Sequence, residues 1–326
     1  MASPRKNSRK HHSRGMIILS IFLELMIVLV FVFVLGWDKG IGDWCKSFST
    51  PVVRELSVTG LNSPNFVLMQ AKGGRIICGE GAEERIYPAS MTKMMTAVLA
   101  LERVKSLDQY ITLTDTMFEG LAEQDATQAG FQPGETVSIR DLLYGALLPS
   151  GAECCLALAE TISGSEEAFS HLMNQKARRI GMLHTNFLNS TGLPDENHYS
   201  TVYDMAVLLK YCLRNSTFRE IVEMPYYSTM GSNIHPDGIT FYSSLFQKLP
   251  DPYVTGGRIM GGKTGYTDAA GLCLASYANI EGRDYILVTA GAPGYTGEPL
   301  HIQDAVTVYE QLGQKAQLLK GQSYSP

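Results

Sequence analysis

A serine and a lysine three residues apart, Ser90 and Lys93, are the first residues in this sequence whose spacing suggests chemistry. Residues i and i+3 lie on one face of a helix, so the Lys93 amine can reach the Ser90 hydroxyl. A serine becomes a good nucleophile only when a neighbouring base removes its proton, and burial at a helix N-terminus can lower a lysine pKa enough for that task. Ser3 and Lys6 share the spacing by chance, whereas Ser90 precedes a long apolar helical pattern. The pair predicts a lysine-activated serine nucleophile.

A second pattern, Gly257 to Thr264, fits the phosphate-binding loop G-x-x-x-x-G-K-[ST] of nucleotide hydrolases. That loop needs an apolar strand before it and a helix that begins at its lysine. Residues 250–253 make a poor central strand, and Gly265 and Gly271 interrupt the required helix. We therefore reject a nucleotide site at this position.

The order of further motifs along the chain narrows the functional interpretation of Ser90 and Lys93. Ser150 is expected to open a helix, and Lys263, Thr264 and Gly265 precede the terminal strands. In this order the chain resembles the active-site serine penicillin-recognising enzymes, which carry S-x-x-K, S-x-N and K-T-G. Within them it is most similar to the low-molecular-mass D-alanyl-D-alanine carboxypeptidases, peptidase family S11, from about Ser63 to the final helix. The similar segments are 87–93 (YPASMTK), 133–136 (PGET), 141–151 (DLLYGALLPSG), 181–187 (GMLHTNF), 190–193 (STGL) and 198–204 (HYSTVYD).

The resemblance implies catalytic roles for three residues. Ser90 would be the acylated nucleophile, Lys93 its general base, and Ser150 a relay of a proton to the leaving group. The implied activity is that of a serine-type D-Ala-D-Ala carboxypeptidase, which removes the terminal D-alanine from peptidoglycan stem peptides through a Ser90 acyl-enzyme. β-Lactams are expected to acylate the same serine as covalent inhibitors. No cofactor and no metal are implied.

The resemblance also implies a substrate-binding role for four residues near the end of the chain. Lys263 would hold positive charge near the substrate carboxylate, and Thr264 would form a hydrogen bond with it. Gly265 would let the substrate lie close against the strand edge. The amide of Tyr266, on the strand after Gly265, would form an oxyanion hole together with the amide of Ser90.

One position departs from the family pattern, because Ala152 stands where S-x-N has an asparagine that helps to hold the substrate peptide. Losing such a contact costs about 1–3 kcal/mol, or about 10- to 200-fold in rate. We expect the following residue, Glu153, to face solvent on a helix. Two alternatives remain open: a β-lactamase-like hydrolase, for which Glu153 could provide the base, and a non-catalytic wall-binding or β-lactam-sensing protein.

Strand patterns at both ends of the main body enclose a helical middle. Strands are predicted at 65–70, 75–79, 271–279 and 284–290, and helices from 90 onward and at 138–148, 152–162, 166–180, 203–213 and 299–318. This order predicts an α/β (α+β) fold with one sheet built from distant segments and an inserted helical subdomain. The resemblance implies the fold of serine β-lactamases and D,D-peptidases, an antiparallel sheet flanked by helices.

Residues 16–36 form an apolar segment that follows a basic tail. The segment has 16 Leu, Ile, Val or Phe residues and one charge, Glu24, and a helix of this length spans about 30 Å. Five cations and no acids in residues 1–15 predict a cytoplasmic N-terminus. We therefore predict a cytoplasmic tail (1–15), a transmembrane anchor (16–36), a juxtamembrane connector (37–62) and an extracytoplasmic catalytic domain (63–326) at the cell membrane. A cleaved signal peptide is the alternative.

The net charge of −5 hides an asymmetry between the tail and the rest of the chain. Beyond the five cations of the tail, 22 basic residues remain against 32 acids, which leaves the rest at −10. This charge argues against nucleic-acid binding.

The six cysteines show no repeated spacing, so buried free thiols are expected, and no His/Cys motif indicates zinc. His184 and His198 are expected to be structural.

Overall fold

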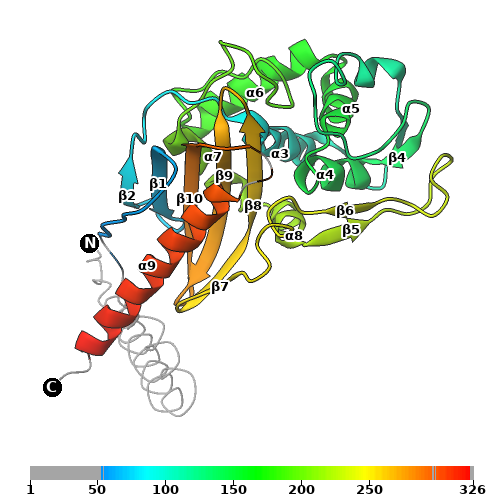
Figure 1. Cartoon of the computed structure of the whole chain (residues 1–326). Helices are drawn as coiled ribbons and strands as arrows, with labels where there is room; N and C mark the ends of the chain where they lie inside the picture. The colour runs from blue at the N-terminus through cyan, green and yellow to red at the C-terminus, as the bar shows by residue number, and fades with distance from the viewer. Residues whose placement is uncertain (1–52, 54, 296, 298, 324–326) are drawn as a thin grey trace, which may run out of the picture. The chain divides into compact units, whose positions relative to one another are not determined.

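The computed structural model describes residues 53, 55–295, 297 and 299–323, and these residues form a six-stranded sheet with helices on both faces (Figure 1). Each strand runs antiparallel to its neighbours, in the order β2-β1-β10-β9-β8-β7. The strands are β1 (Asn65–Gln70), β2 (Ile76–Glu80), β7 (Tyr253–Val254), β8 (Gly257–Thr267), β9 (Gly271–Ile280) and β10 (Arg283–Ala292). Because β1 pairs with β10, the two ends of the described chain meet in one sheet, as predicted.

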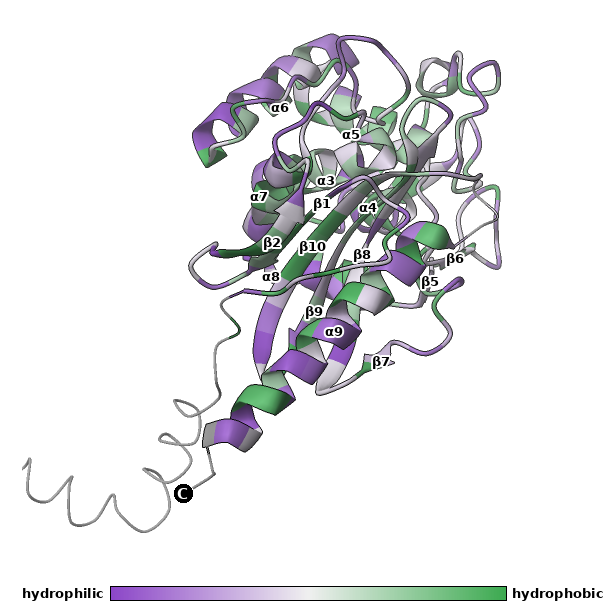
Figure 2. Ribbon diagram, turned by 60° about the vertical axis from the view of Figure 1, so that its left-hand side comes forward, coloured by the Kyte–Doolittle hydropathy of each residue, from purple (hydrophilic) through white to green (hydrophobic). Residues whose placement is uncertain are grey.

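Two hydrophobic cores lie on the two faces of this sheet. One face packs against a group of helices: α3 (Lys93–Arg103), α4 (Ile139–Leu147), α5 (Ala152–Ser163), α6 (Glu166–Ile180), α7 (Val202–Cys212) and α8 (Ser216–Glu223). The other face packs against α9 (Leu300–Ser323), and β1 and β10 are coloured mostly hydrophobic in Figure 2. Val67 and Met69 of β1 belong to the first core, while Phe66 and Leu68 belong to the second. This alternation follows from the two-residue period of a strand.

Polar residues begin four of the helices. Ser138, Ser165, Thr201 and Asn215 each accept a hydrogen bond from the backbone N–H three residues later, at the start of α4, α6, α7 and α8. Such caps satisfy amides that have no partner inside the helix. The helices predicted at 138–148, 152–162, 166–180 and 203–213 correspond to α4, α5, α6 and α7, and their ends agree to within two residues.

β8 differs from the prediction, because the K-T-G motif lies inside an eleven-residue strand and not before it. Its glycines weaken the strand pattern in the sequence, yet close neighbours require them. A Cβ on Gly261 would lie 2.1 Å from the carbonyl oxygen of Val222, and one on Gly262 would lie 2.4 Å from that of Ala275. The apparent nucleotide loop is thus a β-strand with no helix at its lysine, which confirms its rejection.

Two short antiparallel strand pairs were not predicted. One pairs β3 (Tyr110–Thr112) with β4 (Thr136–Ser138), and the other pairs β5 (Tyr226–Ser228) with β6 (Thr240–Tyr242). Strands of three residues are too short to show a reliable two-residue period. The second pair matters for the site because Ser244, two residues after β6, lies within hydrogen-bonding distance of Thr264 on β8.

The predicted membrane segment, residues 16–36, lies outside the described residues. Among the helices that the structure does describe, none combines the length and the apolar character needed to cross a bilayer. The segment before β1 is held to α9, because Asp304 accepts hydrogen bonds from the amides of Asn62 and Ser63. The five cysteines within the described ranges are free thiols.

Candidate active site

Ser90 lies on a short 3₁₀ turn, η1 (Ala89–Thr92), that leads directly into α3. Lys93 is the first residue of α3, and its Nζ donates to Ser90 Oγ at 2.9 Å and to the carbonyl oxygen of Thr191 at 2.8 Å. The predicted contact between serine and lysine is therefore present. Ala89, just before the serine, has φ 46°, a left-handed conformation that costs energy for a residue with a side chain. Such strain often marks functional turns.

A second serine–lysine pair is formed by Ser150 and Lys263. The Nζ of Lys263, on β8, donates to Ser150 Oγ at 3.0 Å and to the carbonyl oxygen of Thr264 at 2.9 Å. The expectation that Ser150 opens a helix is wrong, because Ser150 has φ 78° and α5 begins only at Ala152. The left-handed residue instead turns the chain sharply between α4 and α5.

Both lysines are almost fully buried, with 3% of Lys93 and 1% of Lys263 exposed. Burial disfavours a charged amine and therefore lowers the pKa of both side chains. The positive charge of Lys93 lowers the pKa of Lys263 further, whereas Cys155 and Glu153 partly offset the effect of burial on the pKa of Lys93. An amine with a lowered pKa holds its proton less tightly, so Lys93 can accept the proton of Ser90.

The remaining predicted binding residues follow Lys263 along β8. Thr264 Oγ1 lies 2.6 Å from the hydroxyl of Ser244, within hydrogen-bonding distance. A Cβ on Gly265 would lie 3.1 Å from the backbone nitrogen of Ser90 and 3.2 Å from the Cβ of Ala89. Glycine at position 265 therefore lets the turn that carries the nucleophile approach the strand, a reason that the sequence did not reveal.

Ser90, Lys93 and Tyr266 line one cleft of about 320 Å³, a size that suits a small ligand. Its other walls are residues 124–127, residues 191–194 and residues 267–269, and Ala152 also borders it. Ser150, Lys263 and Thr264 are connected to one another by hydrogen bonds but are not among its lining residues. Within the part of the chain that the structure describes, no group of His, Cys, Asp and Glu could hold a metal ion.

Two residues of the site were missed in the sequence. Thr191 contributes only its carbonyl oxygen, which accepts from Lys93, and every residue type has such an oxygen. The segment around Thr191 matched the family pattern, and this match is the signal that could have drawn attention to it. Ser244 follows a hairpin too short to predict, and no signal in the sequence indicates its contact with Thr264.

Glu153 is fully buried, so the expectation that it faces solvent is wrong. Its Oε1 accepts hydrogen bonds from the amides of Ala129 at 2.6 Å and Gly130 at 3.0 Å. α5 contacts α3, α4 and α6 at once, which leaves little of the helix for solvent. Glu153 does not line the cleft, so it is not placed to act as the base that a β-lactamase needs.

His198 supports the nucleophile turn from outside the cleft. It is 2% exposed, and its Nε2 lies 2.9 Å from Thr92 Oγ1 on η1. Its Nδ1 accepts the backbone N–H of Leu188 at 3.2 Å, so the neutral ring carries its proton on Nε2 and donates to Thr92. Burial lowers the pKa of His198 to about 4. These contacts agree with the structural role expected for this histidine.

We expect the free energy of unfolding to fall when the pH drops below about 6.5. Unfolded His198 takes up a proton near pH 6.5, whereas folded His198 does so only near pH 4, so its contribution is complete above 6.5 and lost as the pH approaches 4. Urea unfolding at pH 7 and pH 5 should show a decrease that His198→Gln makes smaller by about 2 kcal/mol. The exposed His171, replaced by Gln, serves as the control. An equal decrease in both variants would contradict this role of His198.

The comparisons with known proteins agree with this geometry. D-alanyl-D-alanine carboxypeptidase DacF of Bacillus subtilis is 34% identical over 231 residues, which are 69% of this chain and 56% of that protein. DacB2 of Mycobacterium tuberculosis is 27% identical over 250 residues, 75% of this chain and 80% of that protein. The crystal structure of the Streptomyces K15 DD-transpeptidase superposes with a TM-score of 0.71 at 25% identity, covering 78% of this chain and 98% of that one.

The first curated relatives are longer than the region they share with this chain, which spans between 38% and 59% of their length. The family model described as D-alanyl-D-alanine carboxypeptidase matches residues 53–294, a range that contains Ser90, Lys93, Ser150 and the whole of β8. The chain therefore belongs to the Peptidase_S11 family.

Proposed function

We propose that this protein is a serine D,D-carboxypeptidase that removes the terminal D-alanine from peptidoglycan stem peptides. The observation that carries the proposal is the 2.9 Å contact between Lys93 Nζ and Ser90 Oγ at the edge of a cleft. The family match and the second pair, Ser150 and Lys263, support it. β-Lactams would acylate the same Ser90 and act as covalent inhibitors.

The chemistry proceeds in two steps. Lys93 accepts the proton of Ser90, and Ser90 Oγ attacks the carbonyl carbon of the penultimate D-alanine. The amides of Ser90 and Tyr266 stabilise the oxyanion, and the C–N bond breaks as the proton that Lys93 took from Ser90 passes through Ser150 to the departing D-alanine nitrogen. Water then hydrolyses the ester on Ser90, which releases the shortened peptide and restores the serine.

Residues of β8 bind the carboxylate of the terminal D-alanine. Lys263 provides positive charge beside Ser150, and Thr264 offers a hydroxyl whose orientation is set by its contact with Ser244. An anionic group in this position also favours the protonated form of Lys263, because an opposite charge raises the pKa of a buried amine.

The two alternatives make different predictions. A β-lactamase needs a base that hydrolyses the acyl-enzyme rapidly, and the buried Glu153 is bonded to backbone amides away from the cleft. A binding or sensing protein would keep the nucleophile but not release product, and Ala152 is the residue that raises this possibility. The K15 structures carry the name DD-transpeptidase, which adds transfer to an amine as a third outcome.

Release of D-alanine from a pentapeptide ending in D-Ala-D-Ala tests the proposal. We expect release by the wild type and by Ala152→Asn, and none by Ser90→Ala, which lacks the nucleophile. Glycine added as an acceptor distinguishes hydrolysis from transfer, since transfer yields a peptide ending in glycine. Penicillin bound covalently to a wild type that releases no D-alanine would contradict the enzyme and favour the binding protein.

For the location, we propose that residues 16–36 anchor the protein in the cell membrane, with the N-terminus in the cytoplasm and the catalytic domain outside. The apolar length and the five preceding cations support this orientation. Protease added to intact protoplasts should digest the catalytic domain and leave an N-terminal membrane fragment. Recovery of the whole protein in the soluble fraction would contradict the anchor.

A further inference from the structure

A loop between η2 (Asp115–Phe118) and β4, here named the cleft loop (residues 119–131), forms one wall of the cleft beside Ser90. Residues 124–127 of this loop line the cleft together with Ser90, Lys93 and Ala152. The position of this loop therefore helps to set the shape of the cleft.

The cleft loop packs directly on the residues that follow Ser150. The amide of Ala152 donates to the carbonyl oxygen of Thr127 at 2.8 Å. A Cβ on Gly151 would lie 2.7 Å from the Cβ of Ala129 and 3.0 Å from its nitrogen. Only glycine at 151 permits this approach, so the loop and the turn after Ser150 form one packed unit.

Glu153 fastens this unit from within. Its Oε1 accepts hydrogen bonds from the amides of Ala129 and Gly130, while its Oε2 is buried without a hydrogen-bond partner in the described part of the chain. Burying a carboxyl group with one unpaired oxygen is unfavourable, and burial raises the pKa of Glu153. We therefore attribute to Glu153 a role in holding the loop in place, and not in maximising the stability of the fold.

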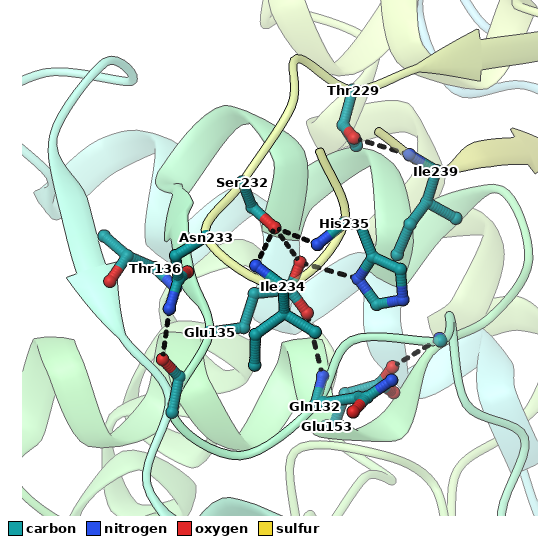
Figure 3. A network of polar contacts seen from close by, with 12 residues as sticks. Gln132, Glu135, Thr136, Glu153, Thr229, Ser232, Asn233, Ile234, His235 and Ile239 are labelled. Atoms are coloured by element: carbon teal, nitrogen blue, oxygen red, sulfur yellow. Dashed lines mark hydrogen bonds and ion pairs between the residues drawn. The ribbon is translucent and has the colours of Figure 1, made fainter. Parts of the chain in front are cut away.

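A second buried carboxylate fastens the far end of the same region, away from the cleft. Glu135 accepts from the amide of Gln132 at 3.0 Å and from the hydroxyl of Ser232 at 2.6 Å, and it lies 2.9 Å from Nδ1 of His235 (Figure 3). Both carboxylates bind backbone amides, but the partners of Glu153 lie within three residues of the cleft-lining Thr127, whereas Gln132, the partner of Glu135, lies five residues from it. Glu135 is therefore the matched control for Glu153.

Gln124 carries the only carboxamide among the residues that line the cleft. Its Nε2 donates to the carbonyl oxygen of Gly120 at 3.0 Å, which holds the side chain within the loop. A carboxamide both donates and accepts hydrogen bonds, as the peptide groups of a substrate require. Ala152, which borders the same cleft, can do neither with its side chain.

We propose that Glu153 is a positioning residue that holds the cleft loop so that Gln124 makes the hydrogen bond to the substrate peptide that Ala152 cannot make. This inference rests on the proposed function, because it concerns how the D-Ala-D-Ala peptide is held for attack by Ser90. It moves the carboxamide contact from α5 to the cleft loop, which packs against the start of that helix.

Kinetics of D-alanine release by the full-length protein, with a synthetic tripeptide ending in D-Ala-D-Ala, test the proposal. We expect Gln124→Ala and Glu153→Ala each to lower kcat/KM about 10- to 50-fold, mainly through a higher KM. The double variant should lose no more than the larger single loss, because both changes remove one contact. Glu153→Gln keeps an oxygen acceptor and should remain within about 3-fold of the wild type.

Glu135→Ala should lower Tm yet leave kcat/KM within about 3-fold. The role of Glu153 would be overturned by multiplicative losses in the double variant, or by an equal loss of kcat/KM in Glu135→Ala. If Glu153→Ala does not fold, wild-type kinetics in Gln124→Ala would still overturn it. A wild type that releases no D-alanine would overturn the proposed function itself, which is a separate result from these losses in an active enzyme.

Discussion

Replacing Lys93 by methionine is expected to slow the acylation of Ser90 by penicillin about 1,000-fold. The amine is the only basic group bonded to the Ser90 hydroxyl in the described residues, and removal of a positioned general base costs about 10²- to 10⁴-fold. Methionine fills nearly the same volume but leaves the buried carbonyl oxygen of Thr191 without its donor, so Tm should fall only slightly. Labelling with a fluorescent penicillin measures the rate. Lys105→Met, at an exposed position after α3, is the control.

The pH dependence of the same reaction gives an independent test. Burial lowers the pKa of Lys93, so the wild-type rate should fall as the pH drops through this lowered value, where the amine gains a proton and ceases to act as a base. The acid limb should lie below the ordinary lysine value of about 10.4. Lys93→Met should lack this limb. A rate within 10-fold of the wild type, with the limb unchanged, would show that another group removes the proton.

The sequence predicted those parts of the site that depend on the reactive groups of particular side chains. Ser90 and Lys93 are three residues apart, so local helical geometry alone brings them together, and the structure confirms it. The pairing of Ser150 with Lys263 crosses 113 residues and could be expected only from the family resemblance. The roles of these residues in catalysis stay predictions, because geometry shows contact and not reaction.

The fold was predictable where strands and helices are long. The strands predicted at 271–279 and 284–290 are present as β9 and β10, and Glu281 and Gly282 between them have φ values of 51° and 73°, as a two-residue hairpin turn requires. β8 was misjudged because its glycines are demanded by neighbours from α8 and β9 that lie close only in the folded chain. Glu153 was misjudged because a charged residue is usually exposed, and its partners belong to a loop without periodic pattern.

Gly192→Ala is expected to slow the acylation of Ser90 at least 100-fold by displacing the turn that carries it. A Cβ at this position would lie 1.9 Å from the carbonyl oxygen of Ala89, 2.4 Å from its carbon and 3.0 Å from the nitrogen of Ser90. Backbone atoms cannot move aside as a flexible side chain can, so η1 must shift. A displacement of about 1 Å at a catalytic group can cost 100-fold, and we expect at least that loss in the acylation rate.

The matched control is Gly164→Ala, at the C-terminal end of α5. Gly164 has φ 80° and Gly192 has φ 85°, so both variants carry the strain of a left-handed alanine, about 1–2 kcal/mol, but a Cβ on Gly164 meets nothing within 4 Å. Gly164→Ala should therefore lose stability and keep the acylation rate, whereas Gly192→Ala should lose both. If the two variants acylate equally fast and unfold at the same urea concentration, the approach of residue 192 to Ala89 does not position the nucleophile.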